Sequence, residues 1–241
     1  MDAHFAHGRV RNWFGGSSNA TTQLLDALHY RGLLRVAWRE SGVRVYAVSP
    51  PTAPARGLAE RRARLDALVD LVVTKYAPLP ARSLRALVSR LRYGVPQWRA
   101  ELGGALQRAE QRLARDEIDG VDWYWPAGEA PSLVSDEPSD ELRLLAPFDP
   151  LVWDRRRFEM LWGWAYRFEA YTPRARRRLG YYALPLLWRD HVIGWGNLSL
   201  REETLQAELG YVAGHAPRER AFERALELEL GRMAEFLGSA R

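Results

Sequence analysis

Residues 15–48 read GGSSNATTQLLDALHYRGLLRVAWRESGVRVYAV, and this stretch decides how the fold begins. Leucines recur at helical spacing after Ser17 and Ser18, two residues of a type that favours helix N-caps. Gly32 follows the last helical positions, as glycine does at many helix ends. The pattern predicts a helix of about fourteen residues with Ser17 or Ser18 as its cap.

The same stretch continues into strand-forming sequence. Residues 34–38 and 43–48 are rich in β-branched and aromatic side chains, and the four residues between them include Gly42. Two such runs around a short loop predict a β-hairpin directly after the helix.

Helices followed by a hairpin recur further along the chain. Amphipathic segments at 58–75, from Ser83, and at 97–114 precede two strand-forming runs, 116–119 and 121–125, on either side of Gly120. Three helices and a hairpin form the pattern of a winged helix-turn-helix unit.

The first 50 residues fit this pattern incompletely. Asp2–Ala6 can supply only the stub of the second helix, and Asn19–Arg31 the third. The first helix of such a unit, which normally completes its core, would lie upstream of Met1.

The C-terminal half has a different character. Four segments alternate or run apolar at strand length, namely 166–171, 181–188, 192–200 and 205–212. They predict a small antiparallel sheet or barrel. Residues 217–237 then show an apolar stripe at helical spacing that ends at Gly238.

Charge divides the chain into three blocks. Residues 1–115 hold 19 basic and 8 acidic side chains, 116–141 hold 0 and 9, and 142–241 hold 16 and 13. We therefore predict an α+β chain of tandem winged helix-turn-helix units, the first incomplete, followed by a small antiparallel β-barrel and a C-terminal helix. The expected parts are an incomplete winged helix at 1–50, a winged helix at 57–126, an acidic linker at 127–141 and the barrel-like domain at 142–241.

Composition limits the function classes. The net charge is +5, and Lys75 is the one lysine among 35 basic residues, so the charge resides on guanidinium groups that suit phosphates and base edges. Codon bias in a GC-rich genome gives the same excess. The absence of cysteine excludes disulfides, thiolate zinc sites and a cysteine nucleophile. With no apolar run near the roughly 20 residues of a membrane span, we expect a soluble, cytoplasmic chain.

The strongest candidate site lies at the start of the first predicted helix. Basic and small polar side chains gather there, and helix N-termini attract anions such as phosphate. The candidate DNA contacts are Arg9, Arg11, Asn12, Ser17, Ser18, Asn19, Thr21 and Thr22, together with Arg39 and Arg44 of the hairpin. The alternative is a capped helix with a solvated loop.

A second basic cluster lies between two strand candidates. Arg174, Arg176, Arg177 and Arg178 would form a cationic hairpin tip that follows a phosphate backbone or enters a minor groove. A solvated turn is the alternative. The many tryptophans and tyrosines favour core packing over base stacking.

Enzymatic motifs are scarce. The five histidines show no zinc-ligand spacing, and there is no phosphate-binding loop or nucleophile elbow. Asp149 and Asp154 are weak candidates for a catalytic carboxylate pair. The alternative is that Asp149-Pro150 forms a turn and Asp154 caps a helix. We expect no metal and no cofactor.

Two distant blocks resemble the winged-helix DNA glycosylases that unhook interstrand crosslinks, the AlkZ or YcaQ type. The first runs from Asp2 to Tyr46, especially GGSSNATTQLLDALHYRGLLRV, and the second runs from Leu145 to Leu200, including LAPFDPLVWDRRRFEMLWGWAYRFEAYTP. The resemblance implies tandem winged helices followed by a β-barrel. It also implies a Gln-x-Gln or Gln-x-Asp motif that positions water and stabilises the sugar cation as the alkylated base leaves.

That motif is missing. The glutamines at 23, 97, 107, 111 and 206 all stand in other contexts. The resemblance therefore implies either an N-terminally truncated sequence or a catalytically incomplete paralogue. We expect a monomer that binds double-stranded DNA, alkylated or crosslinked, and that is inactive as a glycosylase by itself. The alternative is a winged-helix transcriptional regulator.

Overall fold

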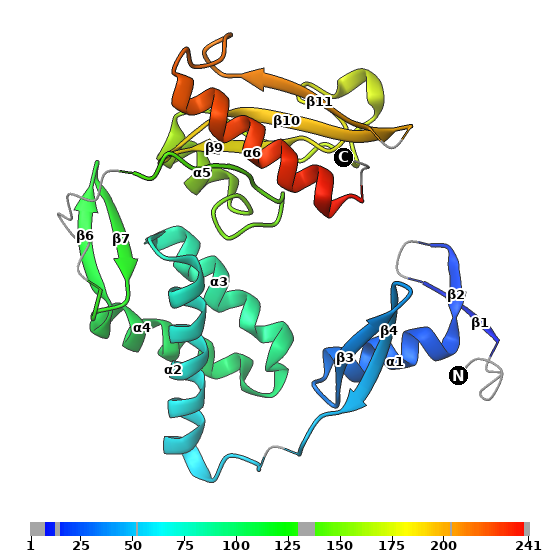
Figure 1. Ribbon diagram of the computed structural model, residues 1–241. Helices are drawn as coiled ribbons and strands as arrows, with labels where there is room; N and C mark the ends of the chain where they lie inside the picture. Colours follow the sequence, from blue (N-terminus) through cyan, green and yellow to red (C-terminus); the bar gives the residue numbers. More distant parts are fainter. Residues whose placement is uncertain (1–7, 13–14, 52, 130–137, 203, 239–241) are drawn as a thin grey trace. The chain divides into compact units, whose positions relative to one another are not determined.

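The computed structural model describes residues 8–12, 15–51, 53–129, 138–202 and 204–238 (Figure 1). Two compact units emerge, residues 1–69 with 87–109 and residues 70–86 with 110–241, and each is described by itself. The predicted helix stub at Asp2–Ala6 lies outside the described residues, as do residues 130–137 of the predicted acidic linker.

The chain begins with a small module of two hairpins and a helix. The predicted helix and second hairpin are confirmed, but the helix begins later than expected because Ser17 and Ser18 belong to a strand that pairs with β1. Asn19 is the N-cap instead. The elements are β1 (Arg9–Arg11), β2 (Ser17–Asn19), α1 (Ala20–Tyr30), β3 (Leu34–Glu40) and β4 (Val43–Val48).

Three further helices follow. They are α2 (Gly57–Tyr76), α3 (Ala81–Gly94) and α4 (Leu102–Arg112). The predicted helix at 97–114 is divided, because Pro96–Glu101 forms a 3-10 helix before α4. The fully buried Leu65, Val69 and Val73 stand four residues apart, so they form one apolar stripe along α2.

The predicted hairpin after these helices is confirmed. It consists of β6 (Ala114–Ile118) and β7 (Val121–Trp125), joined at Asp119 and Gly120 with φ values of 52° and 72°. Two consecutive residues at positive φ are typical of the tight turn that matches the twist of a hairpin. A two-residue strand, β5 (Leu79–Pro80), pairs with β7 and is too short to be visible in the sequence pattern.

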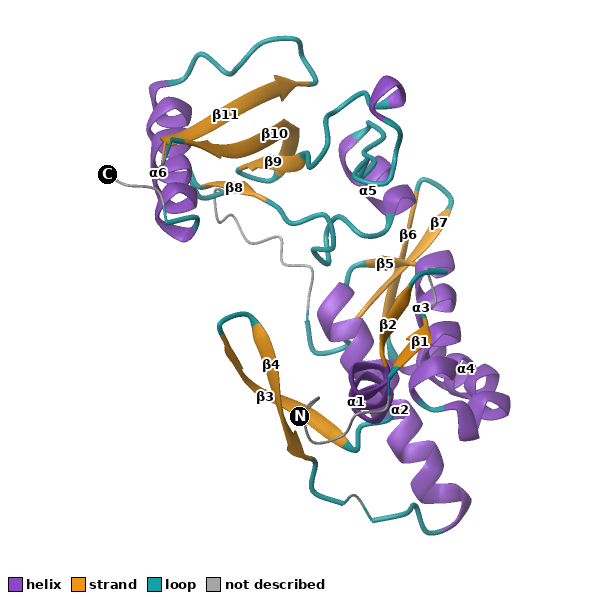
Figure 2. Cartoon of the chain, turned by 90° about the vertical axis from the view of Figure 1, so that its right-hand side faces the viewer, coloured by secondary structure: helices purple, strands orange, loops and turns teal. Residues whose placement is uncertain are grey.

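The C-terminal part contains an open four-stranded antiparallel sheet in the order β11-β10-β9-β8, and the predicted barrel is wrong (Figure 2). Its strands are β8 (Leu142–Leu144), β9 (Leu184–Trp188), β10 (His191–Arg201) and β11 (Thr204–Tyr211). The helix α6 (Arg220–Phe236) lies against this sheet, with the Phe222 ring 5.4 Å from that of Trp188.

The contacts of β8 explain why the sheet stays open. The backbone N–H of Leu144 donates to the buried carboxylate of Glu229 on α6 over 2.7 Å. Arg232, also on α6, donates to the carbonyl of Leu142 over 3.3 Å. Side chains of α6 therefore form hydrogen bonds with backbone groups at the outer edge of β8, where a further strand would pair if the sheet were closed into a barrel.

The strand predicted at 166–171 is wrong, because this segment is irregular. Side chains in this segment and just before it enter the core: the Tyr166 hydroxyl donates to the carbonyl of Ala183, and the Trp164 indole donates to that of Val192. Both rings pack against Phe158 of α5 (Arg155–Trp162). Tyr166, Trp164 and Phe168 belong to the core, as the sequence favoured, whereas Tyr171 is exposed. In the described part of the chain, no helix is long and apolar enough to cross a lipid bilayer.

Candidate nucleic-acid interface

The first candidate surface lies where β2 leads into α1. Arg9 donates from Nε to the Ser17 hydroxyl over 3.0 Å, which links the two strands. Gln23 of α1 donates to the Ser18 hydroxyl over 3.0 Å and to the Arg11 carbonyl over 3.1 Å. Ser17 therefore joins the two strands of the hairpin, and Ser18 joins the hairpin to the helix. Sequence reasoning missed Gln23, because partners 5 and 12 residues away give no periodic signal.

The remaining residues predicted to contact DNA lie at the N-terminus of α1 and in the β1–β2 turn. The Asn19 side chain accepts the N–H of Thr21 over 2.9 Å, as an N-cap does. Thr21 is only 4% exposed, so its hydroxyl lies inside the module, whereas Arg11 and Thr22 are exposed. Asn12 closes the β1–β2 turn through its N–H, which donates to the Gly16 carbonyl over 2.8 Å. The exposed part of this surface is thus carried by Arg9, Arg11, Ser17 and Thr22.

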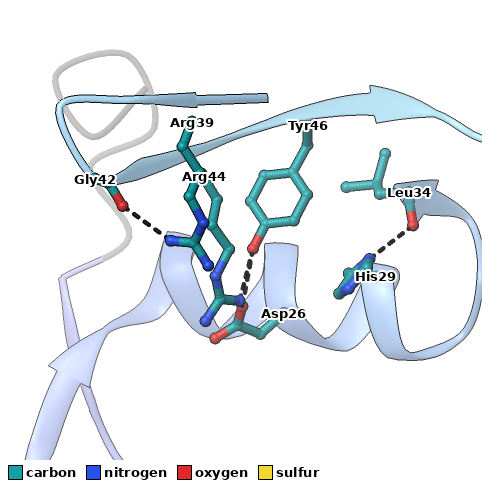
Figure 3. A network of polar contacts seen from close by, with 7 residues as sticks. All are labelled: Asp26, His29, Leu34, Arg39, Gly42, Arg44 and Tyr46. Carbon is teal, nitrogen blue, oxygen red and sulfur yellow. Dashed lines mark hydrogen bonds and ion pairs between the residues drawn. The ribbon is translucent and has the colours of Figure 1, made fainter. Parts of the chain in front are cut away.

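A groove of about 550 Å³ separates α1 from the β3–β4 hairpin (Figure 3). On the hairpin side, Arg39 donates to the carbonyl of Gly42 over 3.0 Å, which fixes its guanidinium at the turn. The groove is lined by Thr22 and Leu25 of α1 and, on the hairpin, by Arg39, Gly42, Val43, Arg44, Val45 and Tyr46.

Arg44 crosses this groove to reach the helix. It lies 2.7 Å from the Asp26 carboxylate and donates to the Tyr46 hydroxyl over 3.2 Å, while that hydroxyl donates to Asp26 over 2.9 Å (Figure 3). The hydrogen bond with Tyr46 and the charge of Asp26 raise the pKa of Arg44. Asp26 was not predicted as a site residue, and it partly neutralises one of the two hairpin arginines that were.

Charge remains strongly positive across this module. Residues 8–50 contain six arginines against Asp26 and Glu40. Two of the arginines, Arg31 and Arg35, are exposed and were missed, because neither belongs to a recognisable motif. An exposed guanidinium cluster beside a helix N-terminus is chemically suited to a polyanion.

The second candidate surface is the loop at residues 172–180. The predicted hairpin tip is wrong: the loop contains a 3-10 turn, Arg174–Arg176, with no strand immediately on either side. The reason is the buried Glu169, whose Oε2 accepts the N–H groups of Arg178 and Leu179 over 2.7 and 2.8 Å. Those N–H groups bind a carboxylate instead of joining a ladder.

The four arginines of this loop differ in their contacts. Arg177 donates to the Thr172 carbonyl over 2.8 Å, and its guanidinium carbon lies 4.7 Å from the centre of the Tyr181 ring. Arg174, Arg176 and Arg178 are exposed. Packing therefore holds Arg177, whereas the other three side chains reach solvent.

The two carboxylates considered for catalysis both have structural contacts. Asp149 accepts the N–H of Leu151 over 2.8 Å within a turn. Asp154 is the N-cap of α5, accepting the N–H groups of Arg156 and Arg157 over 3.1 and 3.2 Å, and also accepts the Ser83 hydroxyl. The turn and cap expected as the alternative are present.

Arg157 is buried next to this cap and is 1% exposed. Its guanidinium donates to the carbonyls of Tyr76, Pro78 and Pro150. Burial lowers the pKa of Arg157, while the charges of Asp154 and Asp149 oppose that shift. The side chain clamps the end of α2 and the segment after it to the start of α5. Among the described residues, no three His, Asp or Glu side chains converge to hold a metal ion.

Comparison with known proteins adds one finding to this geometry. The family model described as DNA glycosylase AlkZ-like matches residues 2–236. The match covers nearly the whole chain, including both arginine-rich surfaces and the open sheet. No solved structure matches.

Proposed function

The chain belongs to the AlkZ-like family of DNA glycosylases, and from that premise we propose that it binds duplex DNA through two arginine-rich surfaces without itself cleaving a glycosidic bond. In this proposal residues 1–50 and 57–126 act as winged-helix units, and α1 faces the duplex. The lesion is an alkylated or crosslinked purine.

One observation carries the DNA contact. Residues 8–50 present six arginines and two acidic side chains around the N-terminus of α1, where exposed Arg11 and Thr22 stand beside N–H groups that attract anions. Ser17, Ser18 and Asn19 support that surface, because their side chains hold β1, β2 and α1 together. The loop at residues 172–180 supplies a second set of phosphate contacts.

The chemistry of base excision supports the second half of the proposal. Cleaving an N-glycosidic bond develops positive charge on the sugar, so the site needs an oxygen beside the anomeric carbon and a positioned water. None of the five glutamines begins a Gln-x-Gln or Gln-x-Asp segment. Asp149 and Asp154 are engaged by backbone N–H groups and, for Asp154, by Ser83.

Binding is tested by fluorescence anisotropy of a labelled duplex across a salt series. If about five phosphates are neutralised, the slope of log K against log salt lies near −4 to −5. Arg11→Ala should reduce that slope by about one, whereas Arg224→Ala, which removes the same charge from an exposed position of α6, should not. A flat salt response, or equal effects of the two variants, contradicts the proposal. A strong preference for one palindromic sequence would favour a transcriptional regulator.

Excision is tested on oligonucleotides that carry an alkylated purine or a crosslink, by gel analysis after alkaline treatment. We expect no excision by the 241-residue chain. Multiple turnover would contradict this, and Asp149→Asn and Asp154→Asn would then identify the carboxylate responsible.

A further inference from the structure

A larger cavity lies in the second unit, and its floor is one face of the β6–β7 hairpin. Side chains alternate between the two faces of a strand, so Asp116 and Ile118 share a face. Their cross-strand partners in the antiparallel register are Trp123 and Val121. One face of the hairpin therefore carries two neighbouring cross-strand pairs, the apolar pair Ile118–Val121 and the pair Asp116–Trp123.

Segments from elsewhere in the unit form the walls. Ala77 and Pro78 contribute one side, and Met160 and Leu161 of α5 another, with Trp125 also facing the space. The cavity volume is about 760 Å³, within the range of roughly 300–1,000 Å³ for small-molecule sites. Ile118 and Met160 are 54% and 46% exposed, so two large apolar side chains face solvent here.

The ionisable side chains that line this cavity are all acidic. Its ionisable lining residues are Asp116, Asp119 and Glu129, and no arginine or lysine is among the described residues that line it. A phosphate would meet three carboxylates and no cation, so the cavity does not extend the proposed DNA surface. A neutral apolar ligand would leave those carboxylates without a counter-charge.

We propose that this cavity binds a flat aromatic cation of small-molecule size. The lining includes the indole rings of Trp123 and Trp125, a ring type that attracts cations, and the apolar side chains of Ile118, Val121, Met160 and Leu161. The three carboxylates select positive charge. An open cavity of this volume accommodates a small molecule more readily than a folded partner, whose interface would cover a larger area.

The clamp described above supports a preformed site. Arg157 belongs to α5, the helix that carries Met160 and Leu161, and its guanidinium donates to the carbonyls of Tyr76 and Pro78 at the other wall and to that of Pro150. The walls are therefore held in place before a ligand arrives, which lowers the conformational cost of binding.

The test uses three probes of matched shape: 10-methylacridinium, acridine at a pH where it is uncharged, and acridine-9-carboxylate. Isothermal titration calorimetry of the full chain should give one saturable site for the cation. Its affinity should exceed that of acridine by about tenfold, and the anion should not bind, because ring faces and carboxylates both favour positive charge.

Matched variants separate the site from general surface charge. Asp116→Asn with Asp119→Asn should lower the affinity for 10-methylacridinium by about tenfold and leave acridine unchanged. Glu117→Gln changes the neighbouring residue on the opposite face of β6 and should have little effect. Ile118→Arg should abolish cation binding by placing a positive charge in the cavity. Equal affinities for cation and neutral probe, no binding up to millimolar concentration, or an equal loss with Glu117→Gln would overturn the proposal.

Discussion

The N-terminal module and the C-terminal sheet stabilise themselves in different ways. In the described part of residues 8–50, Thr21 is the one buried side chain, and Leu24 and Trp38 are 52% and 59% exposed. In the C-terminal part, Leu186 and Phe222 are almost completely buried within a continuous cluster. The N-terminal arginine-rich surface and this apolar cluster therefore belong to different segments. If the proposed function holds, DNA affinity and folding stability should respond to different substitutions.

The largest effect should come from the C-terminal core. Phe222→Ala removes a ring packed on Trp188 and Tyr211, and should lower the free energy of unfolding by about 3–5 kcal/mol. Leu24→Ala in the N-terminal module should change it by no more than about 0.5 kcal/mol. Urea denaturation followed by tryptophan fluorescence measures both. Similar losses of unfolding free energy in the two variants would show that the N-terminal module and the C-terminal core do not differ in this way.

A smaller loss should follow from opening the edge of β8. Glu229→Ala leaves the Leu144 N–H buried without an acceptor, which costs about 1–3 kcal/mol. Glu227→Ala, at an exposed position of the same helix, is the control and should be nearly neutral. If both variants melt at the wild-type temperature, the N–H–carboxylate contact does not stabilise the edge.

Substitutions in the loop at residues 172–180 should change DNA binding more than stability. Arg174, Arg176 and Arg178 replaced together by Ala should reduce the salt slope of DNA binding by about 2 to 3, with stability changed by less than about 0.5 kcal/mol. Arg177→Ala should instead affect mainly stability, since this side chain packs on Tyr181. A triple variant that melts several degrees lower at unchanged affinity would show that the three arginines pack on the protein.

The smallest change concerns the groove in Figure 3. Asp26→Asn removes the carboxylate beside Arg44 and should raise affinity for duplex DNA a few-fold at low salt, because one negative charge disappears and Arg44 loses its counter-charge. Glu110→Gln, an acidic position on α4 paired with Arg85, is the comparison variant. Unchanged affinity with Asp26→Asn would place the DNA contact away from this groove.

How much the sequence predicted depends on the range of the interactions. The hairpins at 34–48 and 114–125 and the helices were predictable because turn residues and periodicity act over a few positions. The open sheet was not, because Glu229 reaches Leu144 across 85 residues. At the candidate site the arginine clusters were visible as composition. The roles of Asp26, Gln23 and Glu169 depend on partners that the fold alone brings together.

The Arg157 clamp also determines which segments open together. The Arg157 guanidinium is hydrogen-bonded to the carbonyls of residues 76, 78 and 150. If either the end of α2 or the start of α5 opens locally, these hydrogen bonds break, and the other segment loses them as well. Residues 76–86 should therefore exchange with α5 as one cooperative unit, at a rate distinct from that of the first turns of α2. The boundary of cooperative unfolding then runs through α2, on the N-terminal side of Tyr76, and hydrogen exchange measured along that helix would locate it.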